Sequence, residues 1–305
     1  MRILVTGASG FLGRHLLPKL RDDGHTVTCP SSKDVDLTKS DGLSILRGES
    51  YDEIFHLAAW TEAGDFCATH GGDQWMVNNY INTNVLSWWK MEQPQARLIA
   101  LGTSVSYEPG KSLLEENYMR GIPSEKFFSY AMTKRMLYAG LVSFSKQFGM
   151  KYLYLVPSTL YGPGYHTDGR QWHFIFDLVR KILRGKLFGE PVVLWGDGHQ
   201  RRELVYVEDF VRSMLMLRGR ASNDIINVGA GEEFTIRHFA LLICRLVDYE
   251  FGRISFDTNA YVGAESKCLS TVKLNGLLPE VVGTALEEGL RKTVEWVKDF
   301  GIENA

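Results

Sequence analysis

Short apolar runs alternate with longer segments of helical periodicity through the first half of the chain. The apolar runs are 2–6, 26–29, 53–58, 97–103 and 151–156, and the helical segments are 11–22, 72–93 and 125–149. Strands that alternate with helices in this way predict an α/β fold built on a parallel, doubly wound sheet. Such sheets bind ligands at the carboxyl ends of their strands. We therefore expect the functional site along that edge.

The pattern changes after Pro157. Loops rich in Gly and Pro surround a helix expected at 171–187, and short strands such as 225–229 and 253–257 follow. This change indicates a smaller, interleaved substrate-binding lobe. The expected division is a dinucleotide-binding domain at 1–160, to which 205–230 return, and a lobe made of 161–204 and 231–305.

The helical segments 72–93 and 125–149 carry apolar residues around most of their circumference. A helix of this kind is buried on nearly all sides. One side packs on the sheet, and the other side needs a partner, either the second lobe or another subunit. We favour a homodimer that forms through these two helices.

Composition excludes several classes of partner. The 305 residues carry a formal net charge of −2, so no electrostatic footprint for nucleic acid or an anionic membrane exists. No apolar run approaches the ~18 residues of a membrane span, and the start of the chain enters a glycine turn too early for a secretory signal. The cysteines show no metal-ligand spacing and are typical of reduced thiols, so we expect a cytoplasmic protein without a metal.

Glycines at positions 7, 10 and 13 lie between the first strand and the first helix. They permit a tight turn that brings backbone N–H groups at a helix N-terminus close to a pyrophosphate. A dinucleotide is therefore the expected cofactor. No acid stands at the end of the second strand to bind a ribose, whereas Arg14 and Lys33 can meet a 2′-phosphate. NADP(H) is favoured over NAD(H), with both cations as solvated surface charges the alternative.

Tyr130 and Lys134 are four residues apart on one predicted helix, so their side chains share a face. A free tyrosine has a pKa near ~10 and is a poor acid–base group at neutral pH. A lysine cation close to the phenol favours the phenolate, so we expect Lys134 to move the pKa of Tyr130 toward neutrality. The pair is a candidate proton-transfer site.

Six segments together resemble one family. They are TGASGFLG (6–13), HLAA (56–59), LGTS (101–104), YAMTK (130–134), LYGPG (160–164) and RELVYVEDF (202–210). Their order and content are similar to those of an extended short-chain dehydrogenase/reductase, the NAD-dependent epimerase/dehydratase family. The resemblance implies that Thr103, Tyr130 and Lys134 form the catalytic triad, with Ser104 as the alternative to Thr103.

The same resemblance implies further cofactor contacts. Besides Gly7, Gly10, Gly13, Arg14, Lys33 and Lys134, these are Ser9, Phe11, Leu12, Asp36, Leu37, Leu57, Ala58, Ala59, Leu101, Pro157 and Leu160.

The second lobe is most similar to the branch of GDP-fucose synthase-like reductases, which act on GDP-4-keto-6-deoxy sugars with NADPH. This resemblance implies a nucleotide-diphosphate sugar as substrate. The implied substrate-side residues are Ser104, Thr159, His173, Lys181, Trp195, Arg202 and Lys267. Simpler roles stay open: a helix cap for His173, a solvated charge for Lys181 and a core position for Trp195. Thr159 stands where the family usually has an asparagine.

Val105 departs from the pattern of the epimerising members of the branch, which place a cysteine two positions after the catalytic hydroxyl. A valine has no proton to exchange, so we expect C4 reduction without epimerisation. Ser106 is expected on the opposite face of an extended segment, and Cys67 and His70 are expected in a loop that can reach the site. The alternatives are a nucleotide-sugar epimerase, epimerase-reductase or dehydratase, and a non-catalytic dinucleotide sensor.

Overall fold

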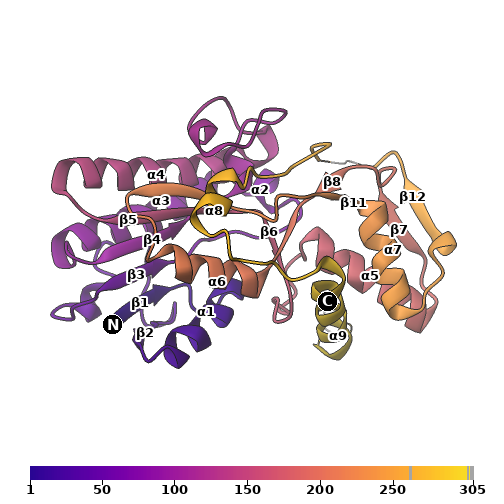
Figure 1. Cartoon of the computed structure of the whole chain (residues 1–305), viewed down its shortest axis with the longest axis horizontal. Coiled ribbons are helices and arrows are strands. Elements are labelled where there is room, and N and C mark those ends of the chain that lie inside the picture. The colour runs from indigo at the N-terminus through magenta and orange to yellow at the C-terminus, as the bar shows by residue number, and fades with distance from the viewer. Residues whose placement is uncertain (261–262, 301, 303–305) are drawn as a thin grey trace.

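The structure, a computed structural model, describes residues 1–260, 263–300 and 302. Its centre is a six-stranded sheet in the order β10-β5-β4-β3-β1-β2, in which all neighbours are parallel (Figure 1). The strands are β1 (Arg2–Thr6), β2 (Thr26–Thr28), β3 (Glu53–His56), β4 (Arg97–Leu101), β5 (Tyr152–Pro157) and β10 (Asp224–Val228). The prediction of a doubly wound parallel sheet is confirmed.

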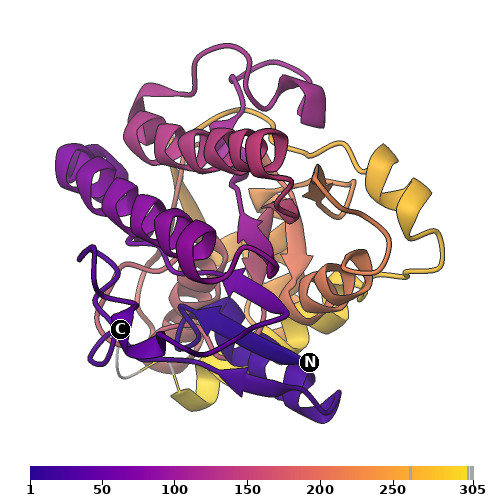
Figure 2. The same ribbon diagram turned by 90° about the vertical axis from the view of Figure 1, so that its left-hand side faces the viewer.

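Helices cover both faces of this sheet because successive strand residues point to opposite sides. Leu4 packs into the cluster formed with α3 and α4, whereas Ile3 and Val5 pack into the cluster formed with α1 and α6. The four helices are α1 (Phe11–Asp22), α3 (Gly71–Glu92), α4 (Phe128–Phe148) and α6 (Val207–Leu217). Figure 2 shows α3 and α4 side by side along one face.

The buried side of α3 is not wholly apolar. Gln74, Asn78 and Asn82 lie one turn apart and are buried, whereas Trp75 and Met76 are exposed. The second side of this helix is therefore not covered by the second lobe, and its coverage by another subunit stays a prediction. The buried amides pair with the loop after β3, where Asn78 Oδ1 accepts a hydrogen bond from the Trp60 N–H at 2.9 Å.

The helix expected at 171–187 is α5 (Phe174–Phe188). It begins three residues later than expected because His173 has extended backbone angles and occupies the N-cap position. The expected helix 125–149 likewise begins with a 3₁₀ turn, η4 (Glu125–Phe127), and α4 ends where Gly149 adopts φ +70°. The late start of α5 leaves His173 on the loop that faces the sheet.

A second apolar cluster joins elements from both later parts of the chain, on the right in Figure 1. Its helices are α5, α7 (Ile236–Val247) and α9 (Leu286–Phe300), and its strands include β7 (Val192–Trp195), which pairs with β12 (Ile254–Asp257). The remaining elements are β6 (Thr159–Tyr161), β8 (Arg201–Arg202), β9 (Leu204–Tyr206), β11 (Phe234–Thr235), α2 (Phe66–Thr69), α8 (Val272–Leu277), η1 (Ser44–Leu46), η2 (Ser104–Ser106), η3 (Glu115–Asn117) and η5 (Phe251–Arg253). The chain enters this region after β6 and returns to the central sheet through β9, α6 and β10.

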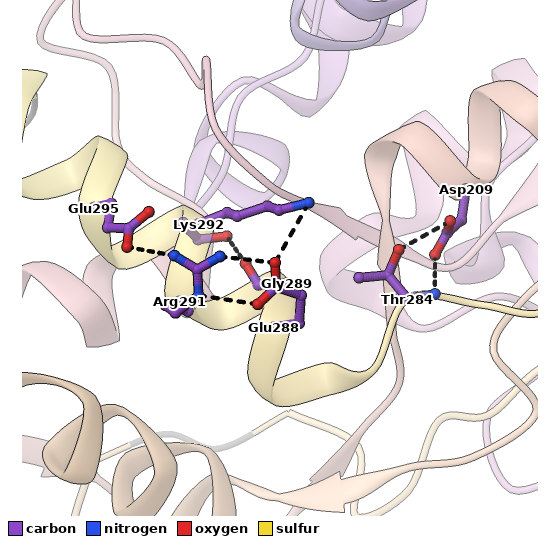
Figure 3. A network of polar contacts seen from close by, with 8 residues as sticks. Asp209, Thr284, Glu288, Gly289, Arg291, Lys292 and Glu295 are labelled. Carbon is purple, nitrogen blue, oxygen red and sulfur yellow. Dashed lines mark hydrogen bonds and ion pairs between the residues drawn. The ribbon is translucent and has the colours of Figure 1, made fainter.

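The approach to α9 is anchored by Asp209 of α6. Its carboxylate accepts hydrogen bonds from the Thr284 N–H at 2.6 Å and the Thr284 hydroxyl at 3.1 Å (Figure 3). Arg291 pairs with Glu288 and Glu295 on the exposed face of α9. Solvent screens such exposed pairs, so they add little to stability and Asp209 is the more important anchor.

None of the described helices combines the length and the apolar character that a membrane span requires.

Candidate active site

The turn after β1 is built for a close backbone approach. Gly7 has φ +72°, and a Cβ at this position would lie 2.6 Å from the backbone nitrogen of Ala58. A Cβ at Gly13 would lie 2.5 Å from the carbonyl oxygen of Ala8, so α1 packs tightly on the turn. Gly10 caps α1 without a side-chain hydrogen bond, which leaves the first-turn N–H groups available. These features fit the pyrophosphate of a dinucleotide.

Acidic side chains near β2 are occupied in local turns. Asp34 accepts hydrogen bonds from the hydroxyl and N–H of Ser31, at 2.6 and 3.2 Å. Asp36 accepts hydrogen bonds from the hydroxyl and N–H of Thr38, at 2.6 and 2.9 Å. Arg14 lies against the glycine turn, because its Nε donates to the carbonyl oxygen of Ser9 at 2.8 Å. A cation, rather than an acid, therefore adjoins the turn.

Thr103 follows the end of β4 by two residues and is the N-cap of the 3₁₀ turn η2. Its Oγ1 accepts a hydrogen bond from the Val105 N–H at 3.4 Å, so the hydroxyl proton is left for another acceptor. The expectation that 104–106 is extended is wrong. Ser106 does point away from the site, but the reason is the turn: it is fully buried, and its hydroxyl donates to the carbonyl oxygen of Ala131.

Tyr130 and Lys134 share one face of α4, and the Lys134 Nζ lies 5.7 Å from the centre of the Tyr130 ring. Burial lowers the pKa of Lys134 to about 8. Burial also raises the pKa of Tyr130 well above its usual value, so the expected shift toward neutrality is absent from this structure. Tyr130 is therefore protonated at neutral pH, which is the state that a proton donor needs.

A cavity of about 320 Å³ brings the predicted triad together with residues of the second half of the chain. The predicted site residues that line it are Phe11, Leu57, Ala59, Leu101, Thr103, Ser104, Tyr130, Lys134, Pro157, Thr159, Leu160, His173 and Lys267. Val105 also lines it. The cavity lies at the carboxyl ends of β3, β4 and β5, where parallel sheets bind their ligands.

The other predicted site residues do not line this cavity. They are Gly7, Ser9, Gly10, Leu12, Gly13, Arg14, Lys33, Asp36, Leu37, Ala58, Lys181, Trp195 and Arg202. Trp195 is 55% exposed, which excludes the core position considered above. Lys181 contacts Asp177 at 3.0 Å and lies 5.8 Å from the centre of the Trp195 ring, so it is not a free solvated charge.

His173 and Lys267 line the cavity and lie near the charge of Arg202, which is outside the lining. His173 carries the N-cap position of α5 but makes no side-chain cap bond, and its Nδ1 is buried without a hydrogen-bond partner. Burial, with the nearby charges of Lys267 and Arg202, lowers the pKa of His173 to about 4. Burial and Arg202 lower the pKa of Lys267 to about 7, against the opposing effect of Glu203. Cations that lower one another's pKa favour an anionic ligand between them.

Two carboxylates hold the segment that carries Lys267. Glu233 accepts a hydrogen bond from the Lys267 N–H at 3.0 Å. Glu203 is buried and accepts hydrogen bonds from the N–H groups of Leu269 and Gly231, at 3.0 and 2.8 Å. The backbone of this segment is therefore fixed, and only the Lys267 side chain extends to the cavity.

Sequence reasoning missed several cavity residues. Thr61, Gly102, Ser158 and Tyr165 line the cavity without belonging to any predicted set. Tyr165 stacks on Phe176, with ring centres 4.0 Å apart, and this contact joins residues from a loop and a helix. No local spacing marks such residues, although each lies in or within two residues of a predicted motif: Gly102 is part of LGTS, Tyr165 follows LYGPG, Ser158 precedes it, and Thr61 follows HLAA.

The glycine turn at the head of a parallel sheet, together with a Thr, Tyr and Lys in one cavity, defines a dinucleotide-dependent enzyme of the short-chain dehydrogenase type. A family model described as "NAD dependent epimerase/dehydratase family" matches residues 3–229, and the chain belongs to this family.

Individual relatives agree with this assignment. The chain is 29% identical to GDP-L-fucose synthase 1 of Arabidopsis thaliana, over 97% of this chain and 92% of the relative. It has the fold of a GDP-L-fucose synthetase from Naegleria fowleri bound to NADP, with a TM-score of 0.84, 23% identity and coverage of 98% and 94%. It also has the fold of a GDP-mannoheptose C4 reductase from Campylobacter jejuni with NADP bound, with a TM-score of 0.84, 20% identity and coverage of 97% and 98%.

Replacing Tyr130 by Phe removes the phenolic proton and keeps the packing of the ring. We expect kcat to fall by about 10²-fold or more, since a positioned acid contributes on this scale. NADPH affinity, measured by fluorescence titration, should change little. Turnover close to that of the unmodified enzyme would exclude Tyr130 as the proton donor.

The pKa of Lys267, about 7, predicts a pH dependence of substrate capture. The cation is present below this pH and is lost above it, so kcat/KM for an anionic substrate should fall as the pH rises through about 7. The variant Lys267→Met should lack this fall. A second fall near pH 8, where Lys134 loses its proton, should remain in both proteins. An unchanged profile in the variant would contradict the assignment of Lys267.

Proposed function

We propose that this protein is an NADPH-dependent C4 reductase of a nucleotide-diphosphate 4-keto sugar, namely a GDP-4-keto-6-deoxy sugar, and that it reduces without epimerising. The observation that carries the proposal is one cavity that is lined by Thr103, Tyr130 and Lys134, by Val105, and by Lys267 at its cationic end.

The residues of the glycine turn fit the cofactor proposed. The N-terminus of α1 would hold the pyrophosphate, Arg14 and Lys33 would meet the 2′-phosphate of NADP(H), and Lys134 would hold a ribose hydroxyl. The two solved structures named above contain NADP, which supports this choice. When bound, the reduced nicotinamide supplies the hydride for C4 of the sugar.

The side chains of this protein manage the proton. Tyr130 transfers its phenolic proton to O4 as the carbonyl becomes an alcohol, and water later restores that proton. Thr103 donates its hydroxyl proton in a hydrogen bond to the same oxygen, because its Oγ1 lone pair is already engaged by the Val105 N–H. The charge of Lys134 stabilises the phenolate that Tyr130 becomes.

The diphosphate of the substrate is proposed to lie near Lys267, His173 and Arg202. A guanidinium binds two phosphate oxygens at once, and an ammonium acts as a compact point charge. The Arabidopsis relative and both solved structures are named for GDP-sugars, which supports guanine as the base. Trp195 and Lys181 lie on the exposed side of the same half of the molecule and are proposed to contact the nucleotide.

Epimerisation needs a group that removes a proton beside the ketone and another that returns one on the opposite face. Val105 can do neither. Cys67 is buried in α2 and does not line the cavity, and the exposed His70 stacks on Phe66 with ring centres 4.7 Å apart. The expectation of a loop is not met, because Cys67 lies in the short helix α2, although its thiol adjoins Thr61 and Tyr130 of the cavity wall. Burial raises the pKa of the Cys67 thiol and so disfavours the thiolate that proton removal needs, which supports reduction alone.

The experiment that tests the function combines the protein with NADPH or NADH and a panel of GDP-, dTDP- and UDP-4-keto sugars. Oxidation of NADPH that depends on a GDP-linked 4-keto sugar is expected. An epimerase or dehydratase would instead retain its cofactor through gel filtration and change the sugar without net oxidation. A non-catalytic sensor would bind NADPH and leave every sugar unchanged.

Running the same reaction in D₂O tests the role of Val105. The product should carry no deuterium at C3 or C5 above a control without enzyme, because the cavity wall at residue 105 has no exchangeable proton. The variant Val105→Cys should introduce deuterium by adding a thiol there, and Val105→Ala should not. Enzyme-dependent deuterium in the unmodified protein would show that another acid–base group acts.

A homodimer is proposed through α3 and α4. Trp75, Met76 and Tyr80 of α3 and Met136 of α4 are large apolar side chains that stay exposed on these helices. The variant Met136→Glu should shift the mass measured by sedimentation from dimer to monomer. Val282→Glu, at another exposed apolar position, should leave it unchanged. A monomer in the unmodified protein would reject this interface.

The domain division at 160, 204 and 230 and a cytoplasmic location also remain proposals. The four cysteines are all free, which supports a reducing compartment. Cell fractionation would test the location, and limited proteolysis would test the division.

A further inference from the structure

Reduction requires hydroxyl groups from two separate elements to meet one oxygen. Thr103 caps η2 and Tyr130 lies in α4, and the two residues are 27 positions apart in the sequence. A displacement of 1 Å in such a pair can cost about 10²-fold in rate. Something must therefore hold η2 at a fixed distance from α4.

A buried hydrogen-bond chain spans this gap. The Ser106 hydroxyl of η2 donates to the carbonyl oxygen of Ala131 in α4 at 3.2 Å. The Tyr118 hydroxyl in turn donates to Ser106 Oγ at 3.2 Å. All three residues are fully buried, so water cannot replace these bonds.

A separate hydrogen bond reaches the lysine. The Tyr154 hydroxyl, from β5, donates its proton to the carbonyl oxygen of Lys134 at 2.7 Å. Its oxygen lies 3.1 Å from the Tyr118 hydroxyl oxygen, but each phenol has one proton and both protons are already donated, so this is a packing contact. The bonded carbonyls thus belong to the residue directly after Tyr130 and to Lys134 itself. Ser106 and Tyr154 therefore each donate one hydrogen bond to the turn of α4 that carries the proposed acid–base pair.

Tyr118 also supports the strand end that carries Thr103. A Cβ at Gly102 would lie 2.8 Å from the Tyr118 hydroxyl oxygen, so this hydroxyl occupies the space beside the backbone that leads into Thr103. Arg135 adds a second tie, because its Nη2 donates to the carbonyl oxygen of Ser106 at 2.6 Å. Ser106 and Arg135 thus join η2 to α4 directly, and the Tyr118 hydroxyl holds Ser106 through the hydrogen bond that it donates to Ser106 Oγ.

We propose that Tyr118 is a positioning residue for catalysis, which acts through Ser106 to set the distance between Thr103 and the Tyr130–Lys134 pair. The proposal rests on the proposed reductase function. It assigns no contact with substrate or cofactor to Tyr118, which does not line the cavity.

The test compares two tyrosines of the same buried cluster. Tyr118→Phe removes the hydroxyl from the chain, whereas Tyr138→Phe removes a hydroxyl that pairs with Tyr152, away from η2. The Tyr138 ring packs 5.8 Å from the Tyr118 ring, so packing effects are matched. With NADPH and the active 4-keto sugar, Tyr118→Phe should lower kcat about 10-fold, while KM for the sugar and NADPH affinity change less than about 2-fold. Tyr138→Phe should keep kcat within about 2-fold.

A second variant guards against a general loss of structure. Ser106→Ala removes both the bond from Tyr118 and the bond to Ala131 and should also lower kcat, and the double variant should lose no more than Ser106→Ala alone, because Tyr118 acts through Ser106. Equal losses in Tyr118→Phe and Tyr138→Phe, or fully multiplicative losses in the double variant, would overturn the proposal. An unmodified protein without turnover would instead reject the reductase function.

Discussion

The close contact between the Gly7 turn and the backbone of Ala58 determines where the site forms. Only a glycine fits here, because the Cβ of any other residue would lie 2.6 Å from the Ala58 nitrogen. The close contact between the two backbones aligns the ends of β1 and β3. Beneath it, His56 links the same two strands, since its Nδ1 bonds the Thr6 hydroxyl at 2.9 Å and its Nε2 bonds Asn82 at 3.1 Å. Burial lowers the pKa of His56 to about 4, so this link stays neutral and does not compete with the charge of Lys134. The edge on which the cofactor and the triad depend is thus fixed by uncharged contacts.

Burial also decides the protonation states within the cavity. It raises the pKa of Tyr130 and lowers those of Lys134 and Lys267, so each group is displaced toward its neutral form. A bound anion would reverse this effect for the lysines, because it restores a partner for their charge. Anionic groups of the substrate and cofactor therefore stabilise the charged forms of Lys134 and Lys267, which burial alone disfavours.

The sequence predicted what local spacing encodes. Glycines at positions 7, 10 and 13 identified the cofactor turn, and the separation of Tyr130 and Lys134 identified a shared helix face. Contacts between distant segments had no such signal. The buried side chains of Gln74 and Asn78 hydrogen-bond the backbone of Trp60, and Asn82 bonds His56. A hydropathy pattern does not reveal these partners and treats the helix as apolar. The 3₁₀ turn after Thr103 was also missed, because three small or β-branched residues after a strand suit an extended segment as well as a turn.

The turn at 104–106 gives the proposed separation of reduction from epimerisation a structural basis. In η2, the position of Thr103 depends on its bond to the Val105 N–H and on Ser106, not on the Val105 side chain. The side chain at 105 is therefore free to vary in chemistry while the hydroxyl beside it stays in place. Proton exchange at the sugar ring and proton delivery to O4 are physically separable on this fold, because one depends on a side chain and the other on the backbone of the same turn.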